Sequence, residues 1–427
     1  MVKKINLSGQ IKKRLPAELV NFMQNAGRIA ASQGQNLYLV GGVVRDLLLE
    51  KANFDLDLVL EGNDINLAIN LAQQLQQPEV MKLTTHPHFG TAKLQWGKWS
   101  VDLTTARSET YPQPGALPSV KPGSIESDFF RRDFTINAMA VHLNPDRYGE
   151  LVDLYGGRDD LEHRLIRILH EKSFIDDATR IWRGLRYEQR LDFQLEADTL
   201  KLLQRDIPML DTISGDRIRY ELECIFKEDL PEKVLRRAQE LGVLARLQPS
   251  LRGNGWLAEK FKKIRQISAP DLPPLALYLS LWLYHLNLAE IEGLISHLRL
   301  PKRVAQPLSD TIKLKARLDS LADPKLKPSR VYSLLHGYSP VAISANWLAS
   351  ESPTPHRHLK LFRDKLRYVK PALTGNDLIK MGIPPGPKIK EILDRLHEAR
   401  LDSKVTSKQG EIDLVKQWLK GSPSPPA

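Results

Sequence analysis

A pair of glycines followed by two closely spaced aspartates is the feature of this sequence that most clearly suggests chemistry. Gly41 and Gly42 lie between a short apolar run and Arg45, and Asp55 and Asp57 follow further along the chain. Glycines allow a backbone to approach phosphate groups, and Arg45 together with a helix N-terminus would balance their negative charge. In a strand, Asp55 and Asp57 would share one face at a separation of roughly 6.6 Å. The pattern predicts a phosphate-bearing ligand beside two carboxylates.

Asp102 is expected on a neighbouring strand, within residues 100–104, and would add a third carboxylate. Carboxylate oxygens are ligands for Mg²⁺, and two such ions can clamp the attacking and leaving oxygens of an in-line phosphoryl displacement. In the alternative interpretation, Asp55 and Asp57 lie on the solvated face of an edge strand. The glycine pair and Arg45 favour the metal site.

A second cluster consists of Arg131, Arg132, Asp133 and Asn137. Adjacent arginines can grip a triphosphate through several charged hydrogen bonds. Asp133 and Asn137 would lie one turn apart on a helix, where they could reach a ribose or tie the segment to the sheet. A salt-bridged helix start is the structural alternative, and these residues alone leave it open.

A third cluster places Asp177, Arg180, Arg183 and Arg186 at steps of three residues. On a helix each step drifts by about 60°, so Asp177 and Arg180 are predicted to share a face, with Arg183 beside them and Arg186 pointing away. An aspartate accepts a hydrogen bond from an exocyclic amino group and an arginine donates to ring acceptors, so the pair could select cytosine and adenine. The alternative is a surface ion pair.

The elements that would position these residues follow from hydrophobic periodicity. Residues 25–165 mix short β-type runs with helices, whereas almost everything after residue 165 has a helical period with Pro or Gly at the joints. The predicted fold class is therefore α+β, a head with a mixed sheet followed by an all-helical region. In the head we expect strands over 37–40 and 53–60, helices over 43–50 and 65–76, a hairpin of 89–95 with 98–104, and a loop over 112–123.

Composition restricts the class of protein. Of the 427 residues, 42% are hydrophobic and 26% are charged, as is usual for folded globular proteins. No run of about 18 apolar residues is present and the N-terminus lacks a hydrophobic secretory segment, so we expect no membrane span and a cytoplasmic location. The single cysteine, Cys224, excludes an intramolecular disulfide and a cysteine-based zinc site.

The net charge of +11 is unevenly distributed along the chain. Residues 251–427 carry +13, whereas residues 1–250 carry −2. A basic C-terminal part favours a phosphate-rich partner, and nucleic acid is favoured over a membrane because no basic amphipathic anchor or lipidation motif accompanies it.

Taken together, these motifs resemble those of the class II tRNA nucleotidyltransferases, which are the CCA-adding enzymes and their bacterial poly(A) polymerase relatives. The resemblance is densest in residues 37–225. One departure is Asp176, where the family usually has a glutamate. The segments that carry the resemblance are 39–46 with 55–57, 131–138, 153–161, 176–186 and 214–222, with weaker similarity at 373–378 and 384–387.

The resemblance implies a nucleotidyltransferase head (25–165), a helical neck with a nucleobase-selecting template (166–230), and a body (231–330) and tail (331–427) that bind the acceptor arm of tRNA. It implies a site in which Asp55 and Asp57 bind Mg²⁺ and Asp102 assists as a third catalytic residue, as ligand or base. It also implies a nucleotide site of Gly41, Gly42, Arg45, Arg132, Asp133, Asn137, Asp177, Arg180, Arg183 and Arg186.

The expected reaction is attack of a tRNA 3′-hydroxyl on the α-phosphate of CTP or ATP, which adds C and/or A to the 3′ end without a nucleic-acid template. Members of the family add CCA, CC or A. The residues 111–127 do not distinguish these activities, and the lack of extra N-terminal domains favours CCA or CC addition. A poly(A) polymerase, a non-catalytic RNA-binding relative and a metal-dependent phosphohydrolase are the alternatives, the last weakened by the lack of a His-Asp pair with ligand spacing.

Overall fold

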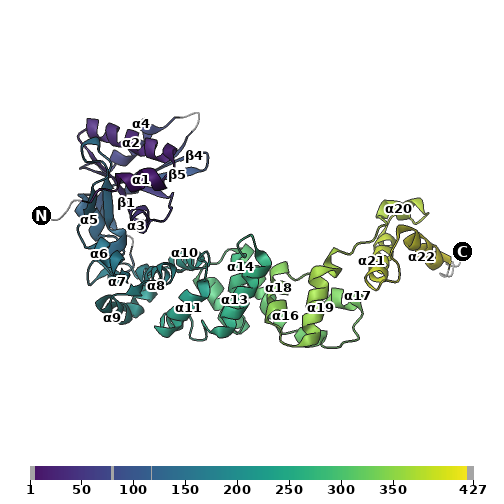
Figure 1. Ribbon diagram of the computed structural model, residues 1–427. Coiled ribbons are helices and arrows are strands. Elements are labelled where there is room, and N and C mark those ends of the chain that lie inside the picture. Colours follow the sequence, from purple (N-terminus) through teal and green to yellow (C-terminus); the bar gives the residue numbers. More distant parts are fainter. Residues whose placement is uncertain (1–4, 78–80, 117, 421–427) are drawn as a thin grey trace. The chain divides into compact units, whose positions relative to one another are not determined.

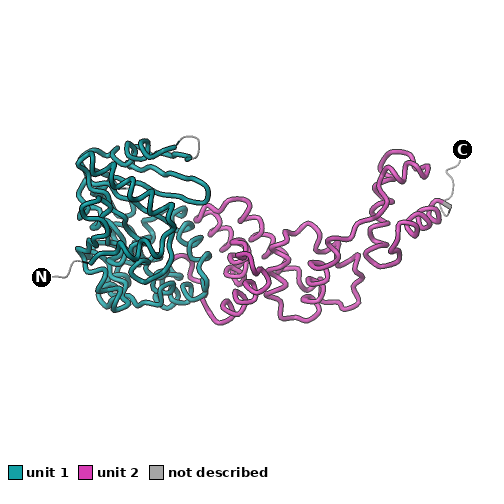
Figure 2. Tube along the Cα trace, turned by 45° about the horizontal axis from the view of Figure 1, so that its top comes forward, with its two compact units in different colours: residues 1–246 teal, residues 247–427 magenta. Residues whose placement is uncertain are grey.

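The computed structural model describes residues 5–77, 81–116 and 118–420. The chain forms two compact units, unit 1 (residues 1–246) and unit 2 (residues 247–427) (Figure 2). Among the described residues, strands occur only in unit 1, and unit 2 is built from helices (Figure 1). The predicted fold class, a mixed sheet with helices followed by a helical region, is confirmed.

A seven-stranded mixed sheet forms the centre of unit 1, in the order β3-β4-β5-β2-β1-β8-β9. Only β2 and β5 run parallel, and the other neighbours are antiparallel. Successive residues of β1 point to opposite faces, and both Leu37 and Tyr38 are buried, so the sheet is covered on both sides at β1. The strands are β1 (Asn36–Val40), β2 (Leu56–Glu61), β3 (Lys82–His86), β4 (Thr91–Trp96), β5 (Trp99–Thr105), β8 (Met139–His142) and β9 (Leu151–Asp153).

The sheet is covered by helices that precede its first strand or lie between its strands in the sequence. After α1 (Ser8–Arg14), α2 (Ala17–Ser32) packs against β1 and against α4 (Leu67–Leu75), and α4 packs against β4 and β5. The buried residues of α2 include Leu19, Met23 and Ala26, spaced by three and four positions as on one face of a helix. Helical residues ahead of position 25, the expected start of the head, therefore also pack on the sheet.

Two expected features of the head differ from the structure. The strand expected over 53–60 begins only at Leu56, because the Asn53 side chain accepts a hydrogen bond from the Asp55 backbone N–H and holds a turn ahead of β2. Residues 112–123 are not a loop throughout, since β7 (Ser119–Pro122) pairs with β6 (Arg107–Thr110). Pro122 ends β7, where a missing N–H is tolerated, so the prolines did not prevent a strand.

The rest of unit 1 is mostly helical. A parallel pair of short strands, β10 (Leu165–Ile166) and β11 (Gln194–Leu195), lies among the helices, and α8 packs against α10 and α11. The helices are α3 (Gly42–Leu48), α5 (Ile125–Phe130), α6 (Gly157–Glu162), α7 (Ser173–Asp176), α8 (Thr179–Leu191), α9 (Ala197–Asp206), α10 (Gly215–Ile225), α11 (Pro231–Glu240) and α12 (Val243–Leu247).

Unit 2 contains two clusters of buried apolar side chains. One includes Leu335 and Leu359, and the other includes Leu378 and Leu396. The finer division of the chain at residues 165, 230 and 330 remains a prediction. The helices are α13 (Gly255–Ser268), α14 (Leu275–Trp282), α15 (Leu288–His297), α16 (Lys302–Lys315), α17 (Pro328–Leu335), α18 (Pro340–Ala349), α19 (Pro353–Asp364), α20 (Gly375–Lys380), α21 (Pro387–Leu401) and α22 (Lys408–Lys420).

Across the described ranges of both units, none of the helices combines the length and the apolar character that crossing a membrane requires.

Candidate active site

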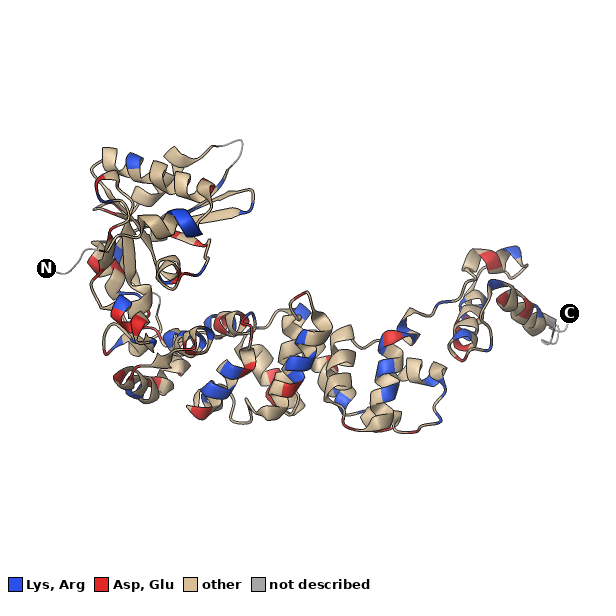
Figure 3. Ribbon diagram, in the orientation of Figure 1, with Lys and Arg blue, Asp and Glu red and all other residues tan. Residues whose placement is uncertain are grey.

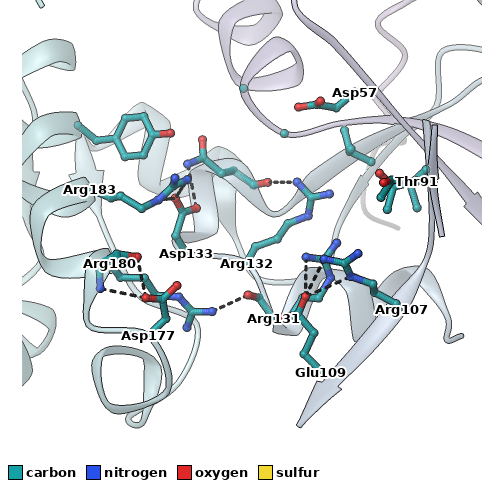
Figure 4. Close-up of a pocket in the computed structure, with 18 of the residues that line it drawn as sticks. Asp57, Thr91, Arg107, Glu109, Arg131, Arg132, Asp133, Asp177, Arg180 and Arg183 are labelled. Carbon is teal, nitrogen blue, oxygen red and sulfur yellow. Dashed lines mark hydrogen bonds and ion pairs between the residues drawn. The ribbon is translucent and has the colours of Figure 1, made fainter. Parts of the chain in front are cut away.

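A cavity of about 470 Å³ in unit 1 brings together most of the residues identified in the sequence (Figure 4). Its walls come from the β1–α3 turn, strands β2 and β4–β6, the segment that follows α5, and the start of α8. Figure 4 shows Asp57 and Asp177 at opposite ends, with arginines between them. The predicted residues that line the cavity are Gly41, Gly42, Asp57, Arg131, Arg132, Asp133, Asn137, Asp177, Arg180 and Arg183.

The sheet determines which carboxylates meet near Asp57. Strands β2 and β5 run parallel with Asp57 directly opposite Asp102, so both side chains project from the same face. Asp102 forms an ion pair with Lys93 at 2.9 Å. Asp55 is exposed and lies one residue ahead of β2, so of the two aspartates only Asp57 belongs to the strand. Neither Asp55 nor Asp102 lines the cavity itself.

The electrostatics around Asp57 suit a cation. Burial raises the pKa of Asp57 to about 6, Asp55 and Asp102 contribute to the rise, and Arg132 and Lys93 oppose it. A divalent cation would neutralise this concentration of carboxylate charge, and carboxylate oxygens are the donors that hard cations prefer. The described residues contain no ready-made cluster of three metal-ligating side chains. The donor chemistry nevertheless fits a divalent cation held by Asp57 and Asp55.

Gly41 forms the turn between β1 and α3 with a φ of +76°, a conformation that favours glycine. A Cβ at this position would lie 3.2 Å from Arg132 Nη1 and 3.6 Å from Asp57 Oδ2. The turn therefore requires glycine both for its backbone conformation and for the space between a guanidinium and a carboxylate. Gly42, the first residue of α3, also lines the cavity.

Arg45 does not face the cavity. Its guanidinium is buried, pairs with Asp46 at 2.9 Å and donates a hydrogen bond to Asn137 Oδ1 at 2.8 Å. The prediction that Arg45 contacts phosphate is wrong, because its donors already bind inside the protein. Arg45 instead positions Asn137, which does line the cavity.

A buried aspartate fixes the two adjacent arginines. Asp128 accepts hydrogen bonds from Nε and Nη2 of both Arg131 and Arg132, at 2.5–3.1 Å. Burial favours the neutral acid, but the two guanidinium charges hold the pKa of Asp128 below its ordinary value. Glu109 on β6 accepts further hydrogen bonds from Arg131 and Arg107. The arginines are thus held in place before any ligand binds.

Asp133 joins the segment after α5 to α8. Its Oδ2 accepts from Arg183 Nε and Nη2 at 2.9 and 2.5 Å, and its Oδ1 accepts from the Phe134 N–H and from Asn137 Nδ2. Burial favours protonation, but Arg183 and the hydrogen bonds prevail and lower the pKa of Asp133 to about 2. Asp133 and Asn137 were expected to reach a ribose or to tie the segment to the sheet, and the contacts seen tie it to α8 and α3 instead.

Asp177 lies between α7 and α8, outside the helix on which it was expected. Its Oδ1 accepts from the N–H and hydroxyl of Thr179 and pairs with Arg217 at 2.7 Å. Arg180 donates to the backbone carbonyls of Ser173 and Arg131. Asp177 therefore does not share a helical face with Arg180 as predicted, although both residues line the cavity. Within the described residues no hydrogen bond to Asp177 Oδ2 is found.

Arg186, like Arg45, Asp55 and Asp102, is a predicted residue that lies outside the cavity. It is buried on α8 and lies 3.4 Å from Glu228 and 3.7 Å from Glu221. These acidic partners come from later elements, so Arg186 joins α8 to them and the prediction that it contacts the nucleotide is wrong.

Several residues of the cavity were not predicted. Arg107, Glu109 and Tyr111 come from β6 and its end, where Tyr111 donates to Glu109 Oε2 at 2.8 Å. The alternation of Arg107 and Glu109 was the available signal, but no strand was predicted between residue 104 and the loop expected over 112–123. The other polar residues, with no evident signal in the sequence, are Thr91, Thr104, Thr179 and Tyr187 on the wall and Arg217 behind Asp177.

Comparisons with known proteins agree with this geometry. Residues 37–167 match the poly A polymerase head domain, and residues 192–253 match the probable RNA and SrmB-binding site of polymerase A. An A-adding tRNA nucleotidyltransferase from Halalkalibacterium halodurans is 30% identical, with 97% of this chain and 96% of that protein aligned. The chain belongs to the tRNA nucleotidyltransferase family. The family generally uses divalent metal ions, which agrees with the donor chemistry around Asp57.

Two further comparisons show how much of the chain resembles known proteins of this family. The chain is 32% identical to an A-adding enzyme from Geobacter sulfurreducens over 95% of its length but spans about half the length of that relative. The solved structure of a CCA-adding enzyme in an apo form superposes with a TM-score of 0.81 at 31% identity, covering 98% of this chain and all of the other. The resemblance inferred from the motifs is confirmed.

Proposed function

We propose that this chain adds C and/or A to the 3′ end of tRNA, using CTP and ATP and no nucleic-acid template. The observation that carries the proposal is the layout of the cavity: Asp57 lies opposite Asp102 at one end, Asp177 and Arg180 lie at the other, and fixed arginines line the space between. A nucleoside triphosphate has its reacting phosphate and its base at two separate ends, and this layout matches both.

At the carboxylate end, Asp55 and Asp57 would hold Mg²⁺, and Asp102 would assist as a further ligand or as a base. Mg²⁺ bound there would offset the negative charge that develops on the transferred phosphoryl group. The tRNA 3′-oxygen forms a bond to the α-phosphorus while the bond to the leaving oxygen of pyrophosphate breaks. The chain contributes the orientation of both groups, since Arg132 and the Gly41 turn lie beside Asp57.

In the middle of the cavity, Arg131 and Arg132 would contact the triphosphate with the donors that Asp128 and Glu109 leave available. At the far end, Asp177 Oδ2 would accept from the exocyclic amino group of cytosine or adenine, and Arg180 would donate to the adjacent ring nitrogen. Uracil and guanine present an N–H there, which Arg180 cannot satisfy.

A second candidate is an enzyme that adds only the terminal A. It is supported by three relatives, from Geobacter sulfurreducens, Aquifex aeolicus and Halalkalibacterium halodurans, which are all named A-adding enzymes. The expectation that missing N-terminal domains favour CCA or CC addition loses its support, because this chain aligns with 96% of the Halalkalibacterium enzyme. CC-adding and CCA-adding relatives, at 30% and 29% identity, match over similar lengths.

The deciding experiment is Mg²⁺-dependent incorporation of labelled CTP and ATP, alone and together, into tRNA transcripts that end before CCA, after C and after CC. Addition of C, C and one A identifies a CCA-adding enzyme, and arrest after CC identifies a CC-adding enzyme. A single A on the CC-ended transcript alone identifies an A-adding enzyme. Long A tracts on any RNA would identify a poly(A) polymerase, and no incorporation would contradict the proposal.

The variant Asp57→Ala separates catalysis from RNA binding. We expect it to abolish incorporation while tRNA binding survives, because the basic unit 2 is unchanged. Asp159→Ala is the matched control, since Asp159 is an exposed carboxylate on α6 outside the cavity, and it should incorporate normally. Normal turnover by Asp57→Ala would indicate a non-catalytic role for this carboxylate and would refute the proposed site.

A further inference from the structure

A second cavity, of about 330 Å³, adjoins the first. Glu109, Tyr111, Arg131 and Arg180 line both cavities, so these four side chains form a shared wall. The far side of the second cavity is formed by α5 and the residues that precede it, by Tyr155 and His170, and by the end of α7. Of the residues that the sequence analysis singled out for ligand contacts, only Arg131 and Arg180 line it. We refer to it as the α5 pocket.

An aromatic platform forms one side of the α5 pocket. Phe130, at the C-terminal end of α5, is 49% exposed, and its ring stacks on His170 with the centroids 4.5 Å apart and the planes 16° from parallel. Burial, with the charge of Arg180, lowers the pKa of His170, so its imidazole is neutral at pH 7. A phenylalanine ring that is stacked on one side and open on the other offers a surface on which a planar base can stack.

The polar groups of the α5 pocket accept hydrogen bonds from a ligand more readily than they bind an anion. Glu126 and Asp176 contribute carboxylates, and Ser108, Ser124 and Ser127 lie around them. Glu126 forms no ion pair within the described residues, and Asp176 approaches only the neutral His170, at 3.9 Å. These groups suit an exocyclic amino group or a sugar hydroxyl.

The cations in the shared wall are largely engaged within the protein, and their remaining donors are assigned above to the nucleotide in the first cavity. Arg131 is held by Asp128 and Glu109, and Arg180 donates to two backbone carbonyls. The lining of the α5 pocket includes no lysine. A triphosphate would therefore meet unpaired carboxylates rather than available cations, which favours a base over a phosphate group as the occupant.

We propose that the α5 pocket binds the 3′-terminal base of the RNA acceptor, cytosine or adenine, stacked on Phe130 with its amino group on Glu126. The proposal rests on the proposed function and names the subsite for the second substrate. The pocket shares a wall with the nucleotide cavity, so its occupant neighbours the incoming nucleotide, as the end of the acceptor strand must. A free second nucleotide is the alternative source of the same base chemistry.

The test measures binding without turnover. A tRNA transcript that carries 2-aminopurine as its last base is titrated with the full chain in the absence of nucleoside triphosphates, so the result does not depend on incorporation. Wild-type protein should quench the fluorescence as the base stacks. Phe130→Ala should lose the quenching and bind the transcript about tenfold more weakly, and Phe130→Trp should restore both.

Tyr220→Ala is the matched control, because Tyr220 is a 61% exposed ring of unit 1 that lines neither cavity. It should bind and quench like the wild type. Quenching retained by Phe130→Ala, or equal losses in both variants, would overturn the proposal. Free 2-aminopurine riboside triphosphate that is quenched through Phe130 and competes with the transcript would assign the pocket to a free nucleotide instead.

A second variant tests the amino group. Wild-type protein should bind a transcript ending in C several-fold more tightly than one ending in U, and Glu126→Gln should remove most of this preference, because an amide can also donate to the uracil carbonyl. An unchanged preference in Glu126→Gln would refute the contact between Glu126 and the base. Failure of the incorporation assay with intact quenching would contradict the proposed function but not this pocket.

Discussion

Buried carboxylates determine how the arginines of the cavity are presented. Asp133 is the clearest case, since its two oxygens are fully used by Arg183, Asn137 and a backbone N–H. Its pKa of about 2, below the ordinary value of 3.8, means that the ionised form stabilises the fold above pH 4 and that this stabilisation is lost as the pH falls toward 2. The shift corresponds to about 2 kcal/mol when the group is fully ionised.

Asp133→Asn should therefore change the pH dependence of stability as well as its level. The free energy of unfolding is measured with urea at pH 5 and pH 3 for both proteins. The difference between wild type and variant should be about 1 kcal/mol smaller at pH 3, because the wild-type carboxylate begins to bind a proton and asparagine cannot. An equal difference at both pH values would mean that the wild-type carboxylate does not titrate in this range and that the assigned ion pair with Arg183 is wrong.

Arg217 is a residue whose importance only the fold reveals. It pairs with Asp177 Oδ1 at 2.7 Å from α10 and leaves Oδ2 available to a base. The pair is partly exposed, so Arg217→Ala should cost about 1 kcal/mol of nucleotide binding, seen as a rise of about fivefold in KM for CTP or ATP. Arg219→Ala on the same helix is the control, because Arg219 pairs with Asp216 and Glu223 outside the cavity. Equal KM values in the two variants would contradict the role of Arg217.

At the scale of elements, the β1–α3 turn couples backbone conformation to the site. Gly41→Ala would adopt a strained φ of +76° and place a Cβ 3.2 Å from Arg132 Nη1. We expect a loss of stability of about 1–3 kcal/mol and at least a tenfold loss of kcat. Gly34→Ala separates the two effects, because Gly34 has a φ of +69° but nothing within 4 Å of the added Cβ. It should lose stability and keep its activity, and retained activity in Gly41→Ala would contradict the packing argument.

Elements defined by local periodicity could be predicted from the sequence, and contacts between distant segments could not. The strand ending at Val40, the helix after it and the β4–β5 hairpin follow from apolar spacing and turn residues. The β6–β7 pair was missed because the prolines of this region were taken as evidence against a strand, although Pro122 only ends β7. Arg45 and Arg186 were misassigned because their partners, Asn137 and Glu228, are brought to them only by the tertiary fold. For the same reason Arg217 was not predicted, because it reaches Asp177 from α10.

At the scale of the whole molecule, charge and cavity are divided between the two units. All residues that line the cavity belong to unit 1, whose net charge is −2, whereas unit 2 carries +13. Figure 3 shows Lys and Arg recurring along α13 and α19 within unit 2. Phosphate neutralisation gives RNA affinity its dependence on salt, so unit 2 is expected to contribute most of the electrostatic part of tRNA binding while unit 1 determines the affinity for nucleotides.

Charge reversal on α19 tests this division. Arg357 and Lys360 are exposed and lie one turn apart. The double variant Arg357→Glu with Lys360→Glu should bind tRNA on the order of tenfold more weakly at low salt and reduce the slope of log Kd against log salt by about 2. Its KM for ATP should be unchanged. The matched control reverses two exposed lysines of unit 1, Lys12 and Lys13 on α1, which lie outside the basic unit and should change the slope little. If the α1 pair reduced the slope as much as the α19 pair, net charge alone would govern binding and unit 2 would hold no dedicated RNA surface. If the α19 pair raised KM for ATP instead, the two substrates would not be bound by separate units.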